Sequence, residues 1–175
     1  MAATYELISS YTVSGSSTNT LTFSSIPNTY TDLSIYVSSR TNVAGNYDID
    51  TLVQINSQGT SSNYSGQFAY WRLGVDSTNS LPSQSSSPAA VFVSAGSSNT
   101  SDYFSTYWSY IANYNSSLRS ERIYVGGVVA AYGIQVFGKA RPGTAEAVTS
   151  LTFKQLSGNN FVADSTFYIY GVKNS

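Results

Sequence analysis

The sequence predicts an all-β protein, an antiparallel β-sandwich of jelly-roll-like type that residues 1–175 form as a single domain. Three observations favour this fold. Short alternations of apolar and polar residues, typical of half-buried strands, recur along the chain. Stretches rich in Gly, Asn, Ser and Pro separate them every ~8–12 residues, as turns between short strands do. No segment shows the apolar periodicity of an amphipathic helix.

Residues 23–37 show the strand pattern most clearly. The first strand of this stretch ends at Ile26-Pro27-Asn28-Thr29, because proline has no N–H to donate to a neighbouring strand and asparagine tolerates turn geometry. A second strand follows, in which every other residue is apolar. Its predicted inward side chains are Leu33, Ile35 and Val37. We expect these two strands, joined by the Pro-Asn corner, to form the frame of the fold.

The remaining strands are expected wherever the alternation returns, giving nine or ten in all. Residues 68–73 fit either a strand or a short helical turn, and the pair Gly126-Gly127 indicates a bulge or bend within its strand. Residues 57–66 and 141–144 are expected to be loop and turn, and residues 76–88 the longest loop. The segments that show the pattern, and among which these strands are expected, are 5–13, 19–26, 32–40, 50–56, 68–73, 90–95, 103–114, 121–131, 133–139, 148–156 and 166–172.

The composition indicates a surface made mainly of hydroxyl and amide groups. Charged residues are 10% of the chain, against roughly 25% in typical soluble domains. Such a surface suits a protein that works packed against neighbours. The net charge is −1, with eight Lys and Arg scattered along the chain. A nucleic-acid partner is therefore not expected, because duplex binding needs a basic stripe.

Several chemistries are excluded by the residue types present. Because the chain has no Cys and no His, it can form no disulfide, thiol nucleophile, Cys/His zinc site or Ser-His-Asp triad. The first residues lack the basic and apolar regions of a signal peptide, and no run approaches the ~20 apolar residues of a membrane helix. We therefore expect no enzyme activity, no cofactor and no membrane partner.

The carboxylates leave two weaker possibilities open. Asp48 and Asp50 lie two residues apart, a modest start for a calcium site, which needs six to eight oxygen ligands. Any two of the nine acidic residues could in principle form a glycosidase pair. Most of the acids fall in predicted turns, however, where carboxylates usually form turn hydrogen bonds.

Residues 103–114 are the most aromatic segment and the best candidate for an interface. As a strand, the segment places Tyr103, Tyr107 and Ile111 on one face and other large rings on the opposite face. Either both faces are buried within the domain, or one of them meets another subunit or a sugar, since Tyr and Trp are enriched in interfaces. The nearby charge cluster Arg119-Ser-Glu-Arg122 forms either a surface ion pair or an intersubunit contact. The candidate interface residues are Phe104, Trp108, Tyr110, Tyr114, Arg119 and Arg122.

Four motifs carry a family resemblance. They are MAATYELISS at 1–10, LTFSSIPNTYTDLSIYV at 21–37, INSQGTSSNYSG at 55–66 and SLTFKQLSGNNFVADSTFYIYGV at 150–172. In this order they resemble a family of small β-sandwich virion proteins of tailed bacteriophages, especially cyanophages. The motifs cover about half of the chain. Residues 68–133 do not align with the family.

The resemblance implies a non-enzymatic structural protein of the virion. Because the chain starts at Met1 and stops after the last strand, we expect the free-standing form of the family. That form implies a capsid decoration (cement) protein, a homo-oligomer, by analogy a trimer, which bridges major capsid proteins on the exterior of the shell. The alternative is the receptor-binding tip of a tail fibre, which contacts tail proteins and holds host polysaccharide on Tyr and Trp rings. A carbohydrate-active enzyme is the third possibility.

Overall fold

The structure is a computed structural model that describes residues 4–15, 18–45, 47–56, 64–72, 90–100, 102–117, 123–129, 134–142, 146–155 and 158–173. These residues form eleven β-strands and no helix, which confirms the all-β prediction. The strands are β1 Tyr5–Thr12, β2 Thr20–Phe23, β3 Asp32–Ser39, β4 Tyr47–Ile55, β5 Tyr64–Arg72, β6 Ala90–Ala95, β7 Ser105–Ile111, β8 Ile123–Val129, β9 Ile134–Pro142, β10 Leu151–Gln155 and β11 Thr166–Val172.

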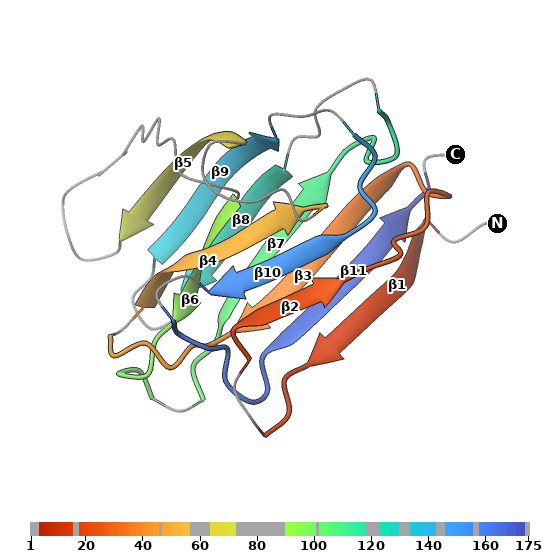
Figure 1. The fold of residues 1–175 in the computed structure, drawn as a ribbon. Helices are drawn as coiled ribbons and strands as arrows, with labels where there is room; N and C mark the ends of the chain where they lie inside the picture. The colour runs from red at the N-terminus through yellow and green to blue at the C-terminus, as the bar shows by residue number, and fades with distance from the viewer. Residues whose placement is uncertain are drawn as a thin grey trace.

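The strands form two antiparallel sheets packed face to face. One sheet has seven strands in the order β1-β11-β3-β7-β8-β9-β5, and the other has four in the order β2-β10-β4-β6. Figure 1 shows the four-stranded sheet lying in front of the larger one. This arrangement confirms the antiparallel sandwich. A jelly roll is not confirmed, because that fold divides eight strands between two sheets.

The Pro-Asn corner carries the chain from one sheet to the other. β2 belongs to the four-stranded sheet and β3 to the seven-stranded sheet, so the two frame strands face each other across the core. Two contacts hold the crossover in place. The Ile26 N–H donates to the Thr149 carbonyl at 3.0 Å, and the Tyr114 hydroxyl donates to the Pro27 carbonyl.

The core is built from the inward residues of both sheets. Phe167 of β11 lies at its centre, with its ring centroid 5.1 Å from that of Phe153 on β10 and 5.1 Å from that of Phe161. Leu33, Ile35 and Val37 of β3 are all buried, as their alternation predicted. Burying each such side chain stabilises the fold by about 1.5–3 kcal/mol.

Three local predictions were wrong. β5 begins at Tyr64, inside the expected loop, and β9 runs to Pro142, which lies opposite Tyr64. Proline is tolerated there because it stands at the end of the strand. Gly126 and Gly127 form no bulge, since β8 keeps an unbroken register with both β7 and β9. The expected loop at residues 76–88 lies outside the described residues.

An irregularity does occur on β1, the edge strand of the larger sheet. Its register with β11 shifts between Leu7 and Ser9, which leaves Ile8 as an extra residue. The strand on the other side of β11 is β3, where the pairing runs regularly from Thr166 to Val172. A bulge of this kind bends an edge strand and increases its local twist.

Position 171 must be glycine because the ring of Tyr30 packs directly against its Cα. Tyr30 is buried, and its ring lies so close to Gly171 that an added Cβ would overlap the ring carbons. We expect Gly171→Ala to lower the free energy of unfolding by about 1–3 kcal/mol, because the ring must move. Urea denaturation measures the loss. In a Tyr30→Ala background the same change should cost much less, and an equal loss in both backgrounds would contradict the clash.

Candidate binding face

The outer surface of the seven-stranded sheet carries a row of exposed aromatic side chains. Tyr168 on β11, Tyr36 on β3 and Trp108 on β7 lie directly opposite one another in the register of the sheet. Their exposed fractions are 37%, 44% and 45%. Neighbouring strands are about 4.8 Å apart, so the three side chains project from one short line across the sheet. Ser10 on β1 and Gly126 on β8 continue the line at its two ends.

A second row extends this surface towards the edge of the sheet. Leu7 lies opposite Tyr170, and the ring of Tyr170 contacts the rings of both Tyr36 and Tyr168, with centroids 5.8 and 6.5 Å apart. Tyr5, on the same side of β1, is as exposed as Leu7, at 52% and 50%. The aromatic face, as we name it, comprises Tyr5, Leu7, Tyr36, Trp108, Tyr110, Tyr168 and Tyr170.

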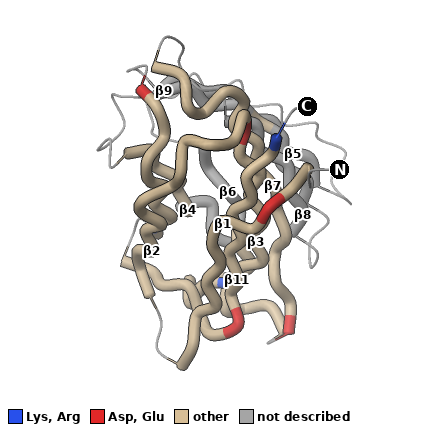
Figure 2. The backbone as a smooth tube through the Cα atoms, turned by 90° about the vertical axis from the view of Figure 1, so that its right-hand side faces the viewer, with Lys and Arg blue, Asp and Glu red and all other residues tan. Residues whose placement is uncertain are grey.

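The aromatic face is large and uncharged. Five of its side chains are exposed, and since a large aromatic has roughly 150–250 Å² of surface, they offer on the order of 400 Å². Contiguous patches of that size on monomers are often functional. On β1, β11, β3 and β7 the other outward positions are mainly Ser and Thr, and the one carboxylate, Asp32, is buried. Figure 2 shows the charges of the described chain to be few and scattered.

Asp32 fixes the corner of the aromatic face where Tyr110 lies. The Tyr110 hydroxyl donates to one carboxylate oxygen at 2.5 Å, and the Asn113 N–H donates to the other at 2.7 Å. Burial and the hydrogen bond to Asp32 raise the pKa of Tyr110 above its ordinary value near 10. Tyr110 is therefore a supporting residue of this surface, whereas Trp108 is free to meet a partner.

The raised pKa of Tyr110 predicts a loss of stability in alkali. Because the folded pKa lies above the unfolded value, the contribution is complete below pH 10 and declines as the pH rises beyond it. Burial raises the pKa values of Tyr30 and Tyr114 in the same direction. Between about pH 9 and about pH 11, the urea concentration at the unfolding midpoint should fall less for Tyr110→Phe than for the unmodified chain. Equal falls would show that Tyr110 does not contribute.

The predicted interface residues do not all reach this face. Trp108 and Tyr110 point outward and Tyr107 and Ile111 inward, as the alternation of β7 indicates. Phe104 is half-buried just before β7. Arg119 and Arg122 lie outside the described residues.

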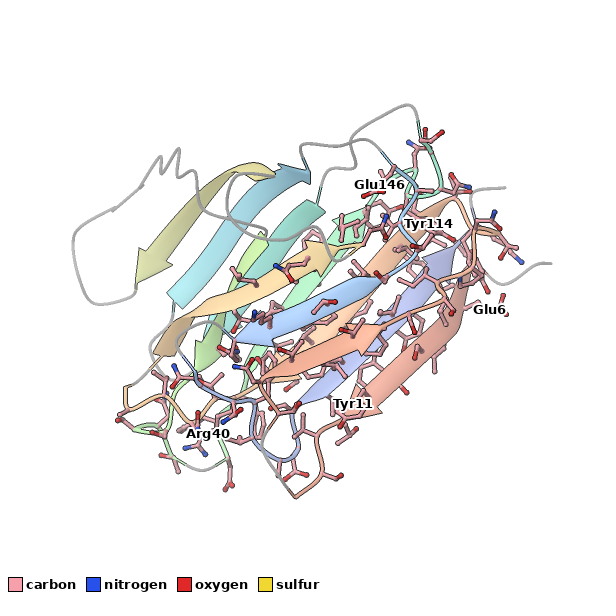
Figure 3. All side chains as sticks on the ribbon, in the orientation of Figure 1. Glu6, Tyr11, Arg40, Tyr114 and Glu146 are labelled. Atoms are coloured by element: carbon pink, nitrogen blue, oxygen red, sulfur yellow. The ribbon has the colours of Figure 1, made fainter. Side chains whose placement is uncertain are left out.

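Tyr114, labelled in Figure 3, is a correction to the prediction. It is fully buried, and its hydroxyl donates to the Pro27 carbonyl. The strand ends at Ile111, and the chain then turns through Asn113, whose φ is 51°. The turn breaks the alternation and brings Tyr114 into the core, so Tyr114 belongs to no outer surface of this chain.

Sequence reasoning missed most of the aromatic face. Tyr5, Leu7, Tyr36, Tyr168 and Tyr170 come from three strands distant from residues 103–114 in sequence. A partial signal was present, because Tyr36 and Tyr168 occupy positions on the polar side of their strands. The sequence does not show which strands are neighbours, and only the order β1-β11-β3-β7 brings these rings together.

The described residues show no metal centre. Within those ranges, no three acidic side chains lie close enough together to share a metal ion. Asp48 and Asp50 fall within β4, where their side chains are not described. Among the same residues, no helix has the length and hydropathy needed to cross a membrane.

Comparison of the chain with protein-family models, with curated proteins and with solved structures finds no match.

Proposed function

We propose that this chain is a structural protein of a bacteriophage virion, a capsid decoration (cement) protein that binds its neighbours through the aromatic face. The observation that carries the proposal is the aligned row of Tyr168, Tyr36 and Trp108 on an uncharged sheet surface. The family resemblance of the sequence supplies the virion context.

The size of the aromatic face suits docking between proteins. A standard interface buries about 800 Å² per partner, so the five exposed side chains would supply about half of one. Trp and Tyr are the residues that contribute most to binding energy at the centres of interfaces. Since the face carries no exposed charge, burying it requires no desolvation of an ion. The rows project from a hydrogen-bonded sheet, so docking requires no ordering of the backbone beneath them.

The partners in this proposal are other copies of the chain, by resemblance in a trimer, and the major capsid protein on the exterior of the shell. Burial of the aromatic face across subunit boundaries then stabilises the shell. The mechanism requires no bond to be made or broken, which agrees with a chain that lacks His and Cys.

Trp108→Ala tests the docking mechanism. We expect the variant to weaken assembly by about 30- to 1,000-fold, as loss of a central interface residue worth about 2–4 kcal/mol would. The free energy of unfolding should change by less than about 1 kcal/mol, because the side chain is nearly half exposed. Sedimentation and binding to stripped capsids measure assembly, and urea denaturation measures stability.

Tyr11→Ala is the matched control. Tyr11 is similarly exposed, at 41%, but lies opposite Phe167 on the other side of β1, outside the aromatic face. Its loss should leave assembly unchanged. An unchanged oligomer and unchanged capsid binding in the Trp108 variant would overturn the docking proposal.

A tail-fibre tip that binds host polysaccharide is the second candidate. The observation that favours it is a line of three rings bordered by hydroxyls, because rings stack on sugar faces while hydroxyls bond to sugar oxygens. The two candidates differ in copy number and in phenotype. A decoration protein is present in hundreds of copies per particle, whereas a tip is present in few. A phage carrying Trp108→Ala in a tip would lose adsorption to its host.

A further inference from the structure

A chain of polar side chains crosses the interior on the opposite side of β3 and β7 from the aromatic face. Gln155 Nε2 donates to Thr51 Oγ1 at 2.6 Å, and Thr51 Oγ1 shares a hydrogen bond with Ser94 Oγ at 2.9 Å. Ser94 Oγ lies 2.8 Å from Ser39 Oγ, which lies 2.6 Å from the Tyr107 hydroxyl. We call these five residues the inter-sheet relay.

The inter-sheet relay is buried along its whole length. Each of its five side chains is at most 2% exposed. It begins on β10 and β4, passes through β6 and ends on β3 and β7, so it joins the two sheets with hydrogen bonds. Each of the five is uncharged. The relay is therefore a connected polar layer within the buried interior of the sandwich.

Unpartnered polar atoms stand at both ends of the inter-sheet relay. At one end, the amide oxygen Oε1 of Gln155 has no hydrogen-bond partner, although its nitrogen is bonded. At the other end, Ser105 lies directly opposite Ser39, and its Oγ is also unpartnered. Both residues are almost completely buried. A buried polar atom without a partner disfavours folding by roughly five- to 150-fold, so such atoms are rarely left unbonded.

We propose that the two ends of the inter-sheet relay are binding sites for ordered internal water, one on Gln155 Oε1 and one on Ser105 Oγ. Water is the ligand that a buried, uncharged polar atom without a protein partner most commonly binds, and it can both donate to the Gln155 amide oxygen and bond to the Ser105 hydroxyl. An ion does not fit, since no relay residue offers a compensating charge. Ser109 Oγ, about 13 Å along β7 from Ser105, is a third unpartnered atom and marks a separate site of the same kind.

A crystal structure at atomic resolution tests the proposal directly. We expect a well-ordered water at about 2.7–3.2 Å from Gln155 Oε1 and another at that distance from Ser105 Oγ. Both waters should also contact at least one further buried polar group. A structure in which these atoms face empty space, or bond to protein carbonyls after a change of rotamer, would overturn the inference.

Ser105→Ala provides an independent test in solution. If Ser105 Oγ binds water, its loss removes a hydrogen-bond partner and should lower the folding equilibrium constant roughly two- to tenfold. If the site is dry, the same change relieves an unpartnered hydroxyl and should raise the constant by about fivefold or more, which would contradict the proposal. Ser10→Ala, at an exposed position on β1, controls for the substitution itself and should change little.

Discussion

Phe167→Ala is expected to lower the free energy of unfolding by about 3–5 kcal/mol, the usual loss when a buried phenylalanine is reduced to alanine. Phe167 is completely buried, and its ring lies against Phe153 of the other sheet and Phe161 of the segment between β10 and β11. The substitution opens a cavity at the point where these three meet. Because the rings come from separate segments, no single neighbour can move to fill it.

Tyr168→Ala provides the matched control on the same strand. Its side chain lies on the aromatic face, 37% exposed, so the variant should lose less than about 1 kcal/mol of stability. Urea denaturation of both variants gives the comparison. A loss for Tyr168→Ala as large as that for Phe167→Ala would contradict the assignment of inner and outer faces on β11.

Asp32→Ala is expected to lower the free energy of unfolding by about 2–4 kcal/mol. The carboxylate is buried and accepts hydrogen bonds from the Tyr110 hydroxyl and the Asn113 N–H. Alanine would leave both donors without an acceptor. Asn113 is held with a positive φ in the turn after β7, so loss of its hydrogen bond also removes the support of a strained backbone.

Two further variants separate the parts of this effect. Asp32→Asn keeps an acceptor for one donor and should recover part of the lost stability, while Tyr110→Phe removes one donor and should cost about 1–2 kcal/mol. Thermal or urea unfolding measures each variant. Equal stability of Asp32→Ala and the unmodified chain would show that the carboxylate does not organise this corner.

Part of the fold follows from the sequence because strands such as β3, β7 and β11 bury the side chains of one face. In β3 and β11 the alternation predicts both the strand and its inward side chains, as Leu33 and Phe167 show. The same reasoning fails at Tyr114, because alternation holds only while the chain stays extended, and the turn at Asn113 is a local conformation that the pattern does not reveal.

The inter-sheet relay and the aromatic face could not be predicted, for a different reason. Ser39 and Ser105 are hydroxyl residues in a chain full of them, yet both are completely buried, Ser39 within the inter-sheet relay and Ser105 opposite it. Likewise, Tyr36 becomes part of the aromatic face only because β11 and β7 flank β3. Both depend on which strands are neighbours, a property that arises from long-range pairing and not from local pattern.

The extra residue at Ile8 has a consequence for solubility. With a net charge of −1, copies of this chain have little mutual repulsion to keep them dispersed. A long, regular edge strand on the larger sheet would then promote open-ended aggregation, in which further copies add by strand pairing. The bulge in β1 between Leu7 and Ser9 interrupts the regular row of hydrogen-bonding groups that such pairing needs. Edge-to-edge pairing of two copies through β1 is thereby disfavoured.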